Sequence, residues 1–259
     1  MLLTADIGNT NIVLGAFEND SLVFVSRLAT ERARTEDQYA VELESIFNLN
    51  KVDFNAFTGA IISSVVPELS NTICLAIKKI LGISPLTLSP GLKTGLNILT
   101  DNPAEVGSDL VAGAVAASNK YPLPCLVMDL GTATKISVID KNGAFCGCSI
   151  APGIAISLEA LSSRTSQLPN ISFKAPDRVI GKNTVDSMRS GTVFGTASML
   201  DGMCQKIEKE LGEKIKTIVA TGGLSSDIIK SCENEITADP VLILEGLKII
   251  YEKNISKKR

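Results

Sequence analysis

Two short acidic turns, far apart in the sequence, carry residue types that bind phosphate and metal ions. Asp6-Ile7-Gly8-Asn9-Thr10-Asn11 follows an apolar run at the start of the chain, and Asp129-Leu130-Gly131-Thr132 follows a second apolar run at 125–128. In each turn an aspartate can hold a cation or its water, and a glycine lets the backbone approach a ligand. Either turn alone is equally typical of an ordinary hairpin. Their recurrence favours a phosphate site that uses both.

Two further features are candidates for a binding site. Thr221-Gly222-Gly223 follows an expected strand, and its glycines would let a flat base lie close to the backbone. Asp109 lies outside the apolar arc of its helix, on a face of small residues that a ligand or another helix could approach. The alternative for Asp109 is a surface aspartate near a helix N-terminus, where negative charge is favourable.

The chain contains no histidine, which removes the usual general base and every histidine metal site. Acid–base chemistry would fall first to a carboxylate. Six cysteines in a chain of 259 residues do not form a disulfide framework. Cys146 and Cys148 are the only close pair, and with no second pair at metal spacing they are interpreted as strand or core thiols.

The elements that would position these residues repeat in two halves. Three strands open each half, expected at 2–7, 11–17 and 22–28 and again at 125–128, 136–139 and 144–150. In the first half a helix at 36–47, a strand at 58–65, a helix at 67–81 and a strand at 85–88 follow. In the second half helices at 152–163 and 185–211, a strand at 216–220 and a final helix at 241–252 follow. This order predicts an α/β fold of two subdomains, 1–118 and 119–259, around a cleft that one acidic turn from each half would face.

Helix boundaries and breaks are also predicted. Asp101-Asn102-Pro103 is a helix-start signal for the helix that carries Val106 and Asp109. Thr184 is the expected cap of the helix at 185–211, which glycines 191, 195 and 202 would break or kink and fit for close packing. Residues 165–182 are interpreted as a long connection.

Composition limits the class of protein. Hydrophobic residues make up 45% of the chain and charged residues 20%, as in a globular protein, and the net charge is −3. This charge argues against nucleic-acid binding by bulk attraction. The basic run Lys257-Lys258-Arg259 is expected to be a solvated tail. We expect a cytoplasmic protein with no membrane segment and no nucleic-acid partner.

The motifs together resemble the type III pantothenate kinase family, within the superfamily of acetate and sugar kinases, heat-shock proteins and actin. Besides the two acidic turns, the matching stretches are Gly91-Leu92-Lys93-Thr94-Gly95, Asp101-Asn102-Pro103, Glu105-Val106-Gly107-Ser108-Asp109, Ile150-Ala151-Pro152-Gly153-Ile154, Asn183-Thr184, Ser190-Gly191 and Thr221-Gly222-Gly223-Leu224. They occur in order and cover nearly the whole chain.

The resemblance implies the fold of actin-like ATPases, two ribonuclease H-like subdomains flanking a nucleotide cleft. Residues 1–118 would carry the acceptor helix and residues 119–259 the dimerisation helix. It also implies a kinase, a phosphotransferase with an alcohol group as acceptor. That enzyme uses ATP with Mg²⁺ to convert pantothenate to 4'-phosphopantothenate, the first step of coenzyme A biosynthesis. Phosphoryl transfer needs positioned phosphates, cations and a weak base, and no histidine.

Residue roles follow from the same resemblance. Asp109 would accept the proton of the substrate hydroxyl, Asp6 would position Mg²⁺, and Asp129 would bind a monovalent cation, K⁺ or NH₄⁺. Contacts to ATP are implied for Asp6, Ile7, Gly8, Asn9, Thr10, Asn11, Ile12 and Val13, and Thr132 would contact its phosphates. Contacts to pantothenate are implied for Gly107, Ser108, Asp109, Leu110 and Thr184. The chain would form a homodimer, with Thr184 reaching the neighbouring site.

The sequence departs from the family pattern mainly near the acceptor. Asp109 is followed by Leu110, where the family usually has an arginine that offers fixed donors. Other departures are Leu99-Thr100 for Arg-Tyr, Lys135 and Ser137 for Thr and Asp, and Cys148 for Gly. Lys93 or Lys135 would supply the positive charge that the missing arginine does not provide.

Two alternatives therefore stay open. One is a catalytically degenerate family member that binds nucleotide in a regulatory role. The other is a kinase for a different small hydroxyl substrate.

Overall fold

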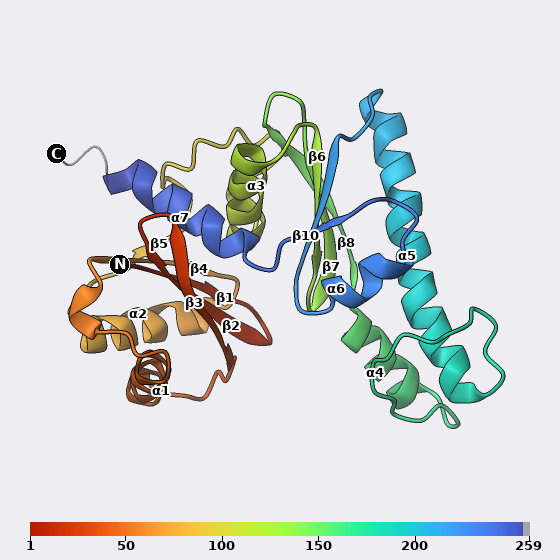
Figure 1. The fold of residues 1–259 in the computed structure, drawn as a ribbon, viewed down its shortest axis with the longest axis horizontal. Helices are drawn as coiled ribbons and strands as arrows, with labels where there is room; N and C mark the ends of the chain where they lie inside the picture. Colours follow the sequence, from red (N-terminus) through yellow and green to blue (C-terminus); the bar gives the residue numbers. More distant parts are fainter. Residues whose placement is uncertain (256–259) are drawn as a thin grey trace. The chain divides into compact units, whose positions relative to one another are not determined.

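A computed structural model describes residues 1–255 of the chain, so the predicted tail Lys257-Lys258-Arg259 lies outside the described residues. The chain forms two compact units, each built around a five-stranded mixed sheet (Figure 1). Among the described residues, unit 1 comprises 1–96, 101–116 and 242–255. Unit 2 comprises residues 97–100 and 117–241.

The sheet of unit 1 has the strand order β3-β2-β1-β4-β5. Its strands are β1 (Leu2–Ile7), β2 (Asn11–Glu18), β3 (Ser21–Ala29), β4 (Gly59–Ser64) and β5 (Leu86–Thr87). β1 pairs antiparallel with β2 and parallel with β4, so the acidic turn after β1 lies beside the carboxyl end of β4. The predicted strands of this half are confirmed to within two residues at each end.

Helices α1 (Glu36–Leu49) and α2 (Pro67–Leu81) cover one face of this sheet (Figure 1). α1 begins with a capping box between Thr35 and Gln38. α2 begins at Pro67 and ends at Gly82, which has a φ of +67° that favours glycine. Their apolar faces pack on β1 in a core that includes Leu3, Ala5, Ile7, Tyr39, Leu43, Phe47, Ile73 and Ile77. A short 3₁₀ turn, η1 (Phe54–Ala56), precedes β4.

Helix α7 (Leu242–Ile255) packs against β1, β2 and β4 of unit 1. The sequence-based boundary at residue 118 places this segment in the second half. In the structure it belongs to unit 1, because its buried Leu244 and Leu247 cover the face of the sheet opposite α1 and α2. Gly246 lets α7 touch helix α3 (Ser108–Lys120), since a Cβ at this position would collide with the backbone of Ala112.

The sheet of unit 2 repeats the topology of unit 1, with the order β10-β9-β6-β7-β8. Its strands are β6 (Cys125–Leu130), β7 (Ala133–Ile139), β8 (Phe145–Pro152), β9 (Thr217–Thr221) and β10 (Thr237–Ala238). β6 pairs antiparallel with β7 and parallel with β9, as β1 does with β2 and β4. The predicted repetition of strand, acidic turn and returning strand is therefore confirmed.

Helices α4 (Ile154–Arg164) and α5 (Thr184–Leu211) follow β8, and α6 (Ser225–Ile228) and η3 (Ile229–Ser231) follow β9. α5 packs Val193 and Leu200 on the apolar face of β6 formed by Leu126, Met128 and Leu130. The predicted connection at 165–182 contains no helix or strand, as expected.

Two predicted helix details are wrong. α5 is one continuous helix, because its glycines keep their backbone N–H groups and therefore do not interrupt the hydrogen-bond ladder. Its cap is Asn183, whose side chain accepts from the backbone N–H of Asp186 at 2.9 Å, and Thr184 is the first helical residue.

The start of α3 also differs from the prediction. Pro103–Glu105 form a separate 3₁₀ turn, η2, and Val106 is extended with φ −66° and ψ 124°. The helix therefore begins at Ser108, and Val106 does not belong to its apolar face. Asp109 consequently lies in the first turn of the helix.

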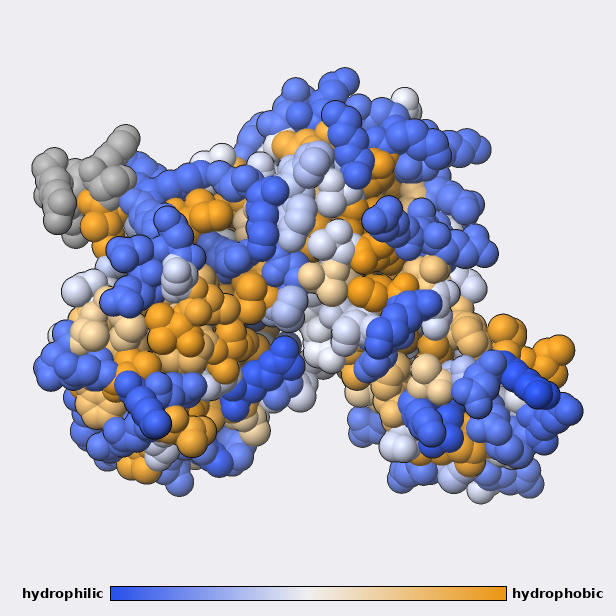
Figure 2. All heavy atoms as spheres, in the orientation of Figure 1, coloured by the Kyte–Doolittle hydropathy of each residue, from blue (hydrophilic) through white to orange (hydrophobic). Residues whose placement is uncertain are grey.

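Polar side chains dominate the surface, with local apolar patches. Figure 2 shows one such patch over the edge strand β3, where Leu22, Val23 and Val25 are 37%, 45% and 40% exposed. Among residues 1–255, no helix combines the length and apolar content needed to cross a membrane.

Candidate active site

The turn between β1 and β2 is held by hydrogen bonds from three directions. Ser63 Oγ, on β4, donates to Asp6 Oδ1 at 2.5 Å. The backbone N–H of Gly8 donates to the carbonyl of Asn11 at 3.0 Å, and Thr30 Oγ1 donates to the carbonyl of Gly8 at 2.7 Å. The position of the Asp6 carboxylate is therefore fixed by the neighbouring parallel strand as well as by its own turn.

The residues of this turn differ in what they can offer a ligand. Asn9, Thr10 and Asn11 are exposed, whereas the side chains of Ile7 and Ile12 are completely buried in the core. Ile7 and Ile12 can therefore contact a nucleotide through backbone groups alone. Gly8, Asp6 and Val13 are half-buried, with Asp6 and Val13 paired across the two strands.

Asp109 is a buried side chain and not a surface one. It is 8% exposed, and its Oδ1 accepts a hydrogen bond from the backbone N–H of Leu110 at 2.8 Å. The first turn of a helix also favours negative charge. The surface interpretation of Asp109 is therefore wrong, because spacing along one helix cannot show what the rest of the fold places around it.

Ser108 ties Asp109 to the end of β4. Its hydroxyl donates to the carbonyl of Ser64 at 3.0 Å and accepts from the backbone N–H of the same residue at 3.0 Å. Ser64 is the parallel-strand partner of Ile7, directly after Asp6. Unit 1 thus brings Asp6 and Asp109, which are far apart in the sequence, to the same carboxyl edge of β1 and β4.

The second acidic turn, between β6 and β7, is built in the same way. The backbone N–H of Gly131 donates to the carbonyl of Ala133 at 3.2 Å, and that of Gly153 donates to the carbonyl of Thr132 at 3.1 Å. Thr132 is exposed at the tip. A Cβ at Gly153 would overlap the carbonyls of Gly131 and Thr132, so a glycine is required where the start of α4 meets this turn.

Asp129 of this turn forms an ion pair with Lys135. Lys135 Nζ lies 2.7 Å from Asp129 Oδ2, and each side chain is 16% exposed. Lys135 was one of two candidates to replace the missing arginine at the acceptor, but its ammonium group contacts Asp129 instead. Lys93, the other candidate, is exposed, and its backbone is hydrogen-bonded to Asn254.

The backbone conformation and the close packing at position 222 both require a glycine. It adopts a φ of +93°, and a Cβ there would lie 2.6 Å from the backbone of Leu130. The glycine turn after β9 therefore passes directly against the end of β6, next to the second acidic turn. The accommodation of a base by Gly222 and Gly223 stays a prediction.

Thr184 is exposed at the start of α5. Beside it, the connection 174–182 and the first two turns of α5 form a polar pocket of about 370 Å³, lined by Lys174, Arg178, Lys182, Asp186 and Arg189 among others. This cluster of basic side chains is suited to an anionic group.

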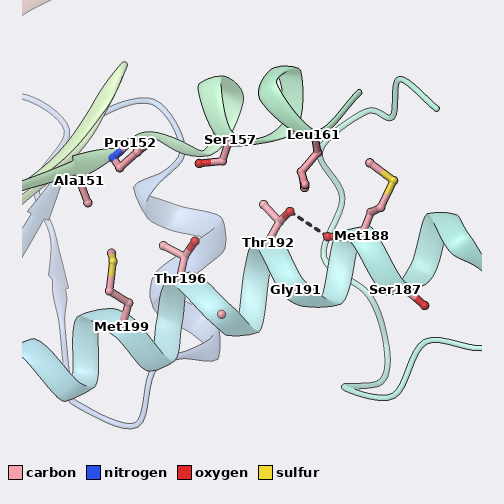
Figure 3. A pocket seen from close by; sticks show the side chains of 11 residues that line it. Ala151, Pro152, Ser157, Leu161, Ser187, Met188, Gly191, Thr192, Thr196 and Met199 are labelled. Atoms are coloured by element: carbon pink, nitrogen blue, oxygen red, sulfur yellow. Dashed lines mark hydrogen bonds between the residues drawn. The ribbon is translucent and has the colours of Figure 1, made fainter. Parts of the chain in front are cut away.

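A second pocket of about 380 Å³ lies between α4 and α5 (Figure 3). Its floor is the small-residue stripe of α5, with Gly191, Thr192, Gly195 and Thr196, while Leu161 reaches in from α4. The Thr192 hydroxyl donates to the carbonyl of Met188 at 2.8 Å, so it is used within the helix. The pocket is mainly apolar, and no ionisable side chain lines it. It therefore offers a surface for apolar packing but no group for acid–base or metal chemistry.

Sequence reasoning missed Ser63 and Ser64, which hold Asp6 and Ser108. Both serines could have been predicted as site residues from the sequence. They are polar residues near the end of the expected strand 58–65, and the carboxyl ends of parallel strands meet at one edge of a sheet. Residues 1–255 contain no cluster of three or more side chains of cysteine, aspartate or glutamate placed to hold a metal ion by themselves.

Comparison with known proteins gives a consistent result. A family model described as type III pantothenate kinase matches residues 2–206. Two proteins named type III pantothenate kinase, from Halalkalibacterium halodurans and an Exiguobacterium strain, are 43% and 42% identical to the chain. Each alignment covers 98% of this chain, and 100% and 99% of the respective relatives.

A solved structure from Campylobacter jejuni, described as a Baf family transcriptional activator, has a TM-score of 0.62 at 21% identity over 98% of this chain and 99% of its own. At this identity the likeness shows the fold alone. Together with the two repeated sheets, it confirms the predicted α/β fold of two ribonuclease H-like halves, as in the actin-like ATPases.

Proposed function

The chain belongs to the type III pantothenate kinase family, and from this premise we propose that it uses ATP to phosphorylate pantothenate to 4'-phosphopantothenate, the first step of coenzyme A biosynthesis. The observation that carries the proposal is the match to relatives of that name over 98% of the chain. The placement of Asp6 and Asp109 at one edge of unit 1 supports it, since phosphoryl transfer needs a cation-binding carboxylate near a weak base.

Asp109 is proposed as the proton acceptor for the substrate hydroxyl. The Ser108–Ser64 hydrogen bonds fix the first turn of α3, so the carboxylate is held by the fold before substrate arrives. Because the side chain is buried, its charge acts in a medium that screens less than water does.

ATP is proposed to bind the two acidic turns, through residues 6–13 in unit 1 and Thr132 in unit 2. The exposed Asn9, Thr10 and Asn11 offer side-chain donors, whereas Ile7 and Ile12 offer backbone groups alone. The Asp6 carboxylate fits Mg²⁺, a hard cation that binds through one or two carboxylates plus substrate phosphates and keeps several waters. Bound there, Mg²⁺ would neutralise charge on the phosphates.

Pantothenate is proposed to contact the segment from Gly107 to Leu110. The Ser108 hydroxyl has one hydrogen, and the carbonyl of Ser64 receives it, so Ser108 can only accept a hydrogen bond from substrate. Leu110 offers no polar group, so a substrate carboxylate would need another cation. The basic pocket beside Thr184 has side chains of that kind.

The proposal includes a homodimer, in which Thr184 reaches the neighbouring site. The exposed position of Thr184 and the basic residues around it support this role. In this proposal α3 is the acceptor helix of the N-terminal half, and α5 is the dimerisation helix of the C-terminal half. We propose a cytoplasmic location because coenzyme A synthesis uses cytoplasmic ATP.

The alternative, a nucleotide-binding protein with a regulatory role, is motivated by Leu110 in place of the usual arginine. A kinase for a different small hydroxyl substrate has the same motivation. The test is ADP release from Mg-ATP with pantothenate and with a panel of other small alcohols. We expect turnover with pantothenate above the rest of the panel. Tight ATP binding without turnover on any acceptor would favour the regulatory alternative, and preference for another alcohol the second.

A further inference from the structure

The ion pair of Asp129 with Lys135 bears on the monovalent cation that the family resemblance implies. That cation, K⁺ or NH₄⁺, would need the Asp129 carboxylate as a ligand. Asp129 Oδ2 already lies 2.7 Å from the Lys135 ammonium nitrogen, within the range of a charge-assisted hydrogen bond. The residues present therefore do not fit an additional monovalent cation at this carboxylate.

The sheet itself imposes this pairing. Asp129 on β6 and Lys135 on β7 are direct partners across the antiparallel pair. Directly opposed residues point to the same face of a sheet, about 5 Å apart at Cβ. Leu130 and Ile136, their neighbours in sequence, point into the core with α5, so both charged side chains lie on the other face. The pair is thus fixed by the strand register and is not a chance contact of two mobile side chains.

Burial distinguishes this pair from the surface ion pairs of the chain. Both side chains are 16% exposed, whereas those of Lys230 and Asp227, 3.9 Å apart, are 74% and 51% exposed. A partly buried carboxylate needs a compensating charge, and interactions between charges are screened less there. To bind Asp129, a free cation would have to displace the Lys135 ammonium group from the carboxylate. If it bound beside that group, the two positive charges would repel each other at close range.

The pair also lies where a cation is useful. Asp129 directly precedes the turn Leu130-Gly131-Thr132, and a Cβ at Gly131 would lie 3.3 Å from Asp129 Oδ1. The carboxylate therefore lies against the turn that is proposed to contact phosphates. A lysine ammonium carries the same charge as K⁺ and donates hydrogen bonds as NH₄⁺ does.

We propose that the Lys135 ammonium group takes the place of the monovalent cation, so that this chain works without K⁺ or NH₄⁺. Lys135 is a positioning residue that holds Asp129 and the second acidic turn in their working arrangement. The inference rests on the proposed kinase function for its role in turnover, but the occupancy of the site by Lys135 can be tested separately.

The first experiment compares turnover of the unmodified protein in KCl, NH₄Cl, NaCl and LiCl at equal ionic strength, with Mg-ATP and pantothenate. We expect rates that agree within about twofold, since a fixed ammonium supplies the charge in every salt. Stimulation of about tenfold by K⁺ or NH₄⁺ over Na⁺ would overturn the proposal, because it would reveal a cation site that Lys135 does not fill.

The second experiment removes the built-in charge. Lys135→Thr introduces the residue common in the family, and we expect its rate to fall about tenfold or more in NaCl and to recover in KCl. The matched control is Lys141→Thr, which removes an exposed lysine from the turn after the same strand. It should remain insensitive to the choice of salt. A Lys135→Thr variant that keeps full rate in NaCl would contradict a role for the ammonium group.

The third experiment needs neither turnover nor a variant. Crystals of the unmodified protein with an ATP analogue are soaked in RbCl, and anomalous scattering locates Rb⁺, which behaves as K⁺ does. We expect no Rb⁺ peak at Asp129, and a peak bonded to this carboxylate would overturn the proposal. If no acceptor is phosphorylated in any salt, the kinase function fails, while this measurement still decides whether Lys135 holds the site.

Discussion

Ser108 and Ser64 are joined by two hydrogen bonds through a single hydroxyl group. Ser108 Oγ donates to the carbonyl of Ser64 and accepts from its backbone N–H, both at 3.0 Å. This satisfies both backbone groups of a residue at the end of β4, where the strand ladder stops. The proposed base, Asp109, is the next residue, so the hydroxyl links the position of the base to the strand that also holds Asp6 through Ser63.

Replacing Ser108 tests this link. Ser108→Ala leaves both backbone groups of Ser64 without their partner, and we expect a loss of about 1–3 kcal/mol in unfolding free energy. A small displacement of Asp109 should lower kcat by about 10- to 100-fold with little change in the KM for ATP. Ser108→Thr retains a hydroxyl and should recover much of the rate. Ser45→Ala, which removes an exposed hydroxyl bonded within α1, is the control and should change neither quantity.

Asp109→Asn keeps the shape of the side chain and removes its ability to accept a proton. We expect kcat to fall by about 10²- to 10⁴-fold, the usual contribution of a general base. The dissociation constant of ATP, measured by calorimetry, should stay the same, because residues 6–13 and Thr132, and not the Asp109 carboxylate, are proposed to contact the nucleotide. Asp101→Asn, at an exposed position before α3, is the matched control. An Asp109→Asn variant with unchanged kcat would show that another group takes the proton.

Gly246 controls how closely α7 approaches α3. A Cβ there would collide with the backbone of Ala112, so Gly246→Ala should force the two helices apart and lower the unfolding free energy by about 1–3 kcal/mol. Gly202→Ala, in α5, is the control, because a Cβ at that position meets no atom within 4 Å. That change should raise stability by up to about 1 kcal/mol, as expected from helix propensity. Urea unfolding of both variants measures the difference, and equal shifts of the same sign would refute the close contact.

Much of the fold was predictable from sequence because its signals are local. The end of α2 follows from Gly82, and the strands around both acidic turns follow from short apolar runs. The cap of α5 was misplaced by one residue, since Asn183 and Thr184 are both good caps and the choice depends on the path of the preceding connection.

The site was predictable in part. The two acidic turns were found because each is one continuous motif. The burial of Asp109 was not, because it depends on a contact between residues 64 and 108, which no local pattern reveals. The ion pair of Asp129 and Lys135 was intermediate in predictability. No single motif contains both residues, but the register of a short hairpin places them opposite each other.

The buried cysteines predict how stability changes at alkaline pH. Burial raises the pKa of the Cys125 thiol from 9.0 to about 12 and that of the Cys204 thiol to about 11. The unfolded chain therefore loses these protons first as the pH rises. Stability that is fully present below the unfolded pKa of 9.0 is lost from there until the folded thiols ionise. At about pH 10 each such thiol should lower the unfolding free energy by about 1 kcal/mol.

Comparing two alanine variants isolates this effect from other alkaline titrations. Cys125→Ala removes a completely buried thiol, so its unfolding free energy should fall by about 1 kcal/mol less than that of the unmodified protein between about pH 8 and about pH 10. Ser163→Ala removes an exposed hydroxyl that does not ionise in this range, and it should keep the full dependence on pH. Urea titrations at each pH give the values, and only the slope with pH is compared, because the cavity left by Cys125→Ala lowers stability equally at every pH. Parallel curves for all three proteins would show that the Cys125 thiol ionises as readily in the folded chain as in the unfolded one.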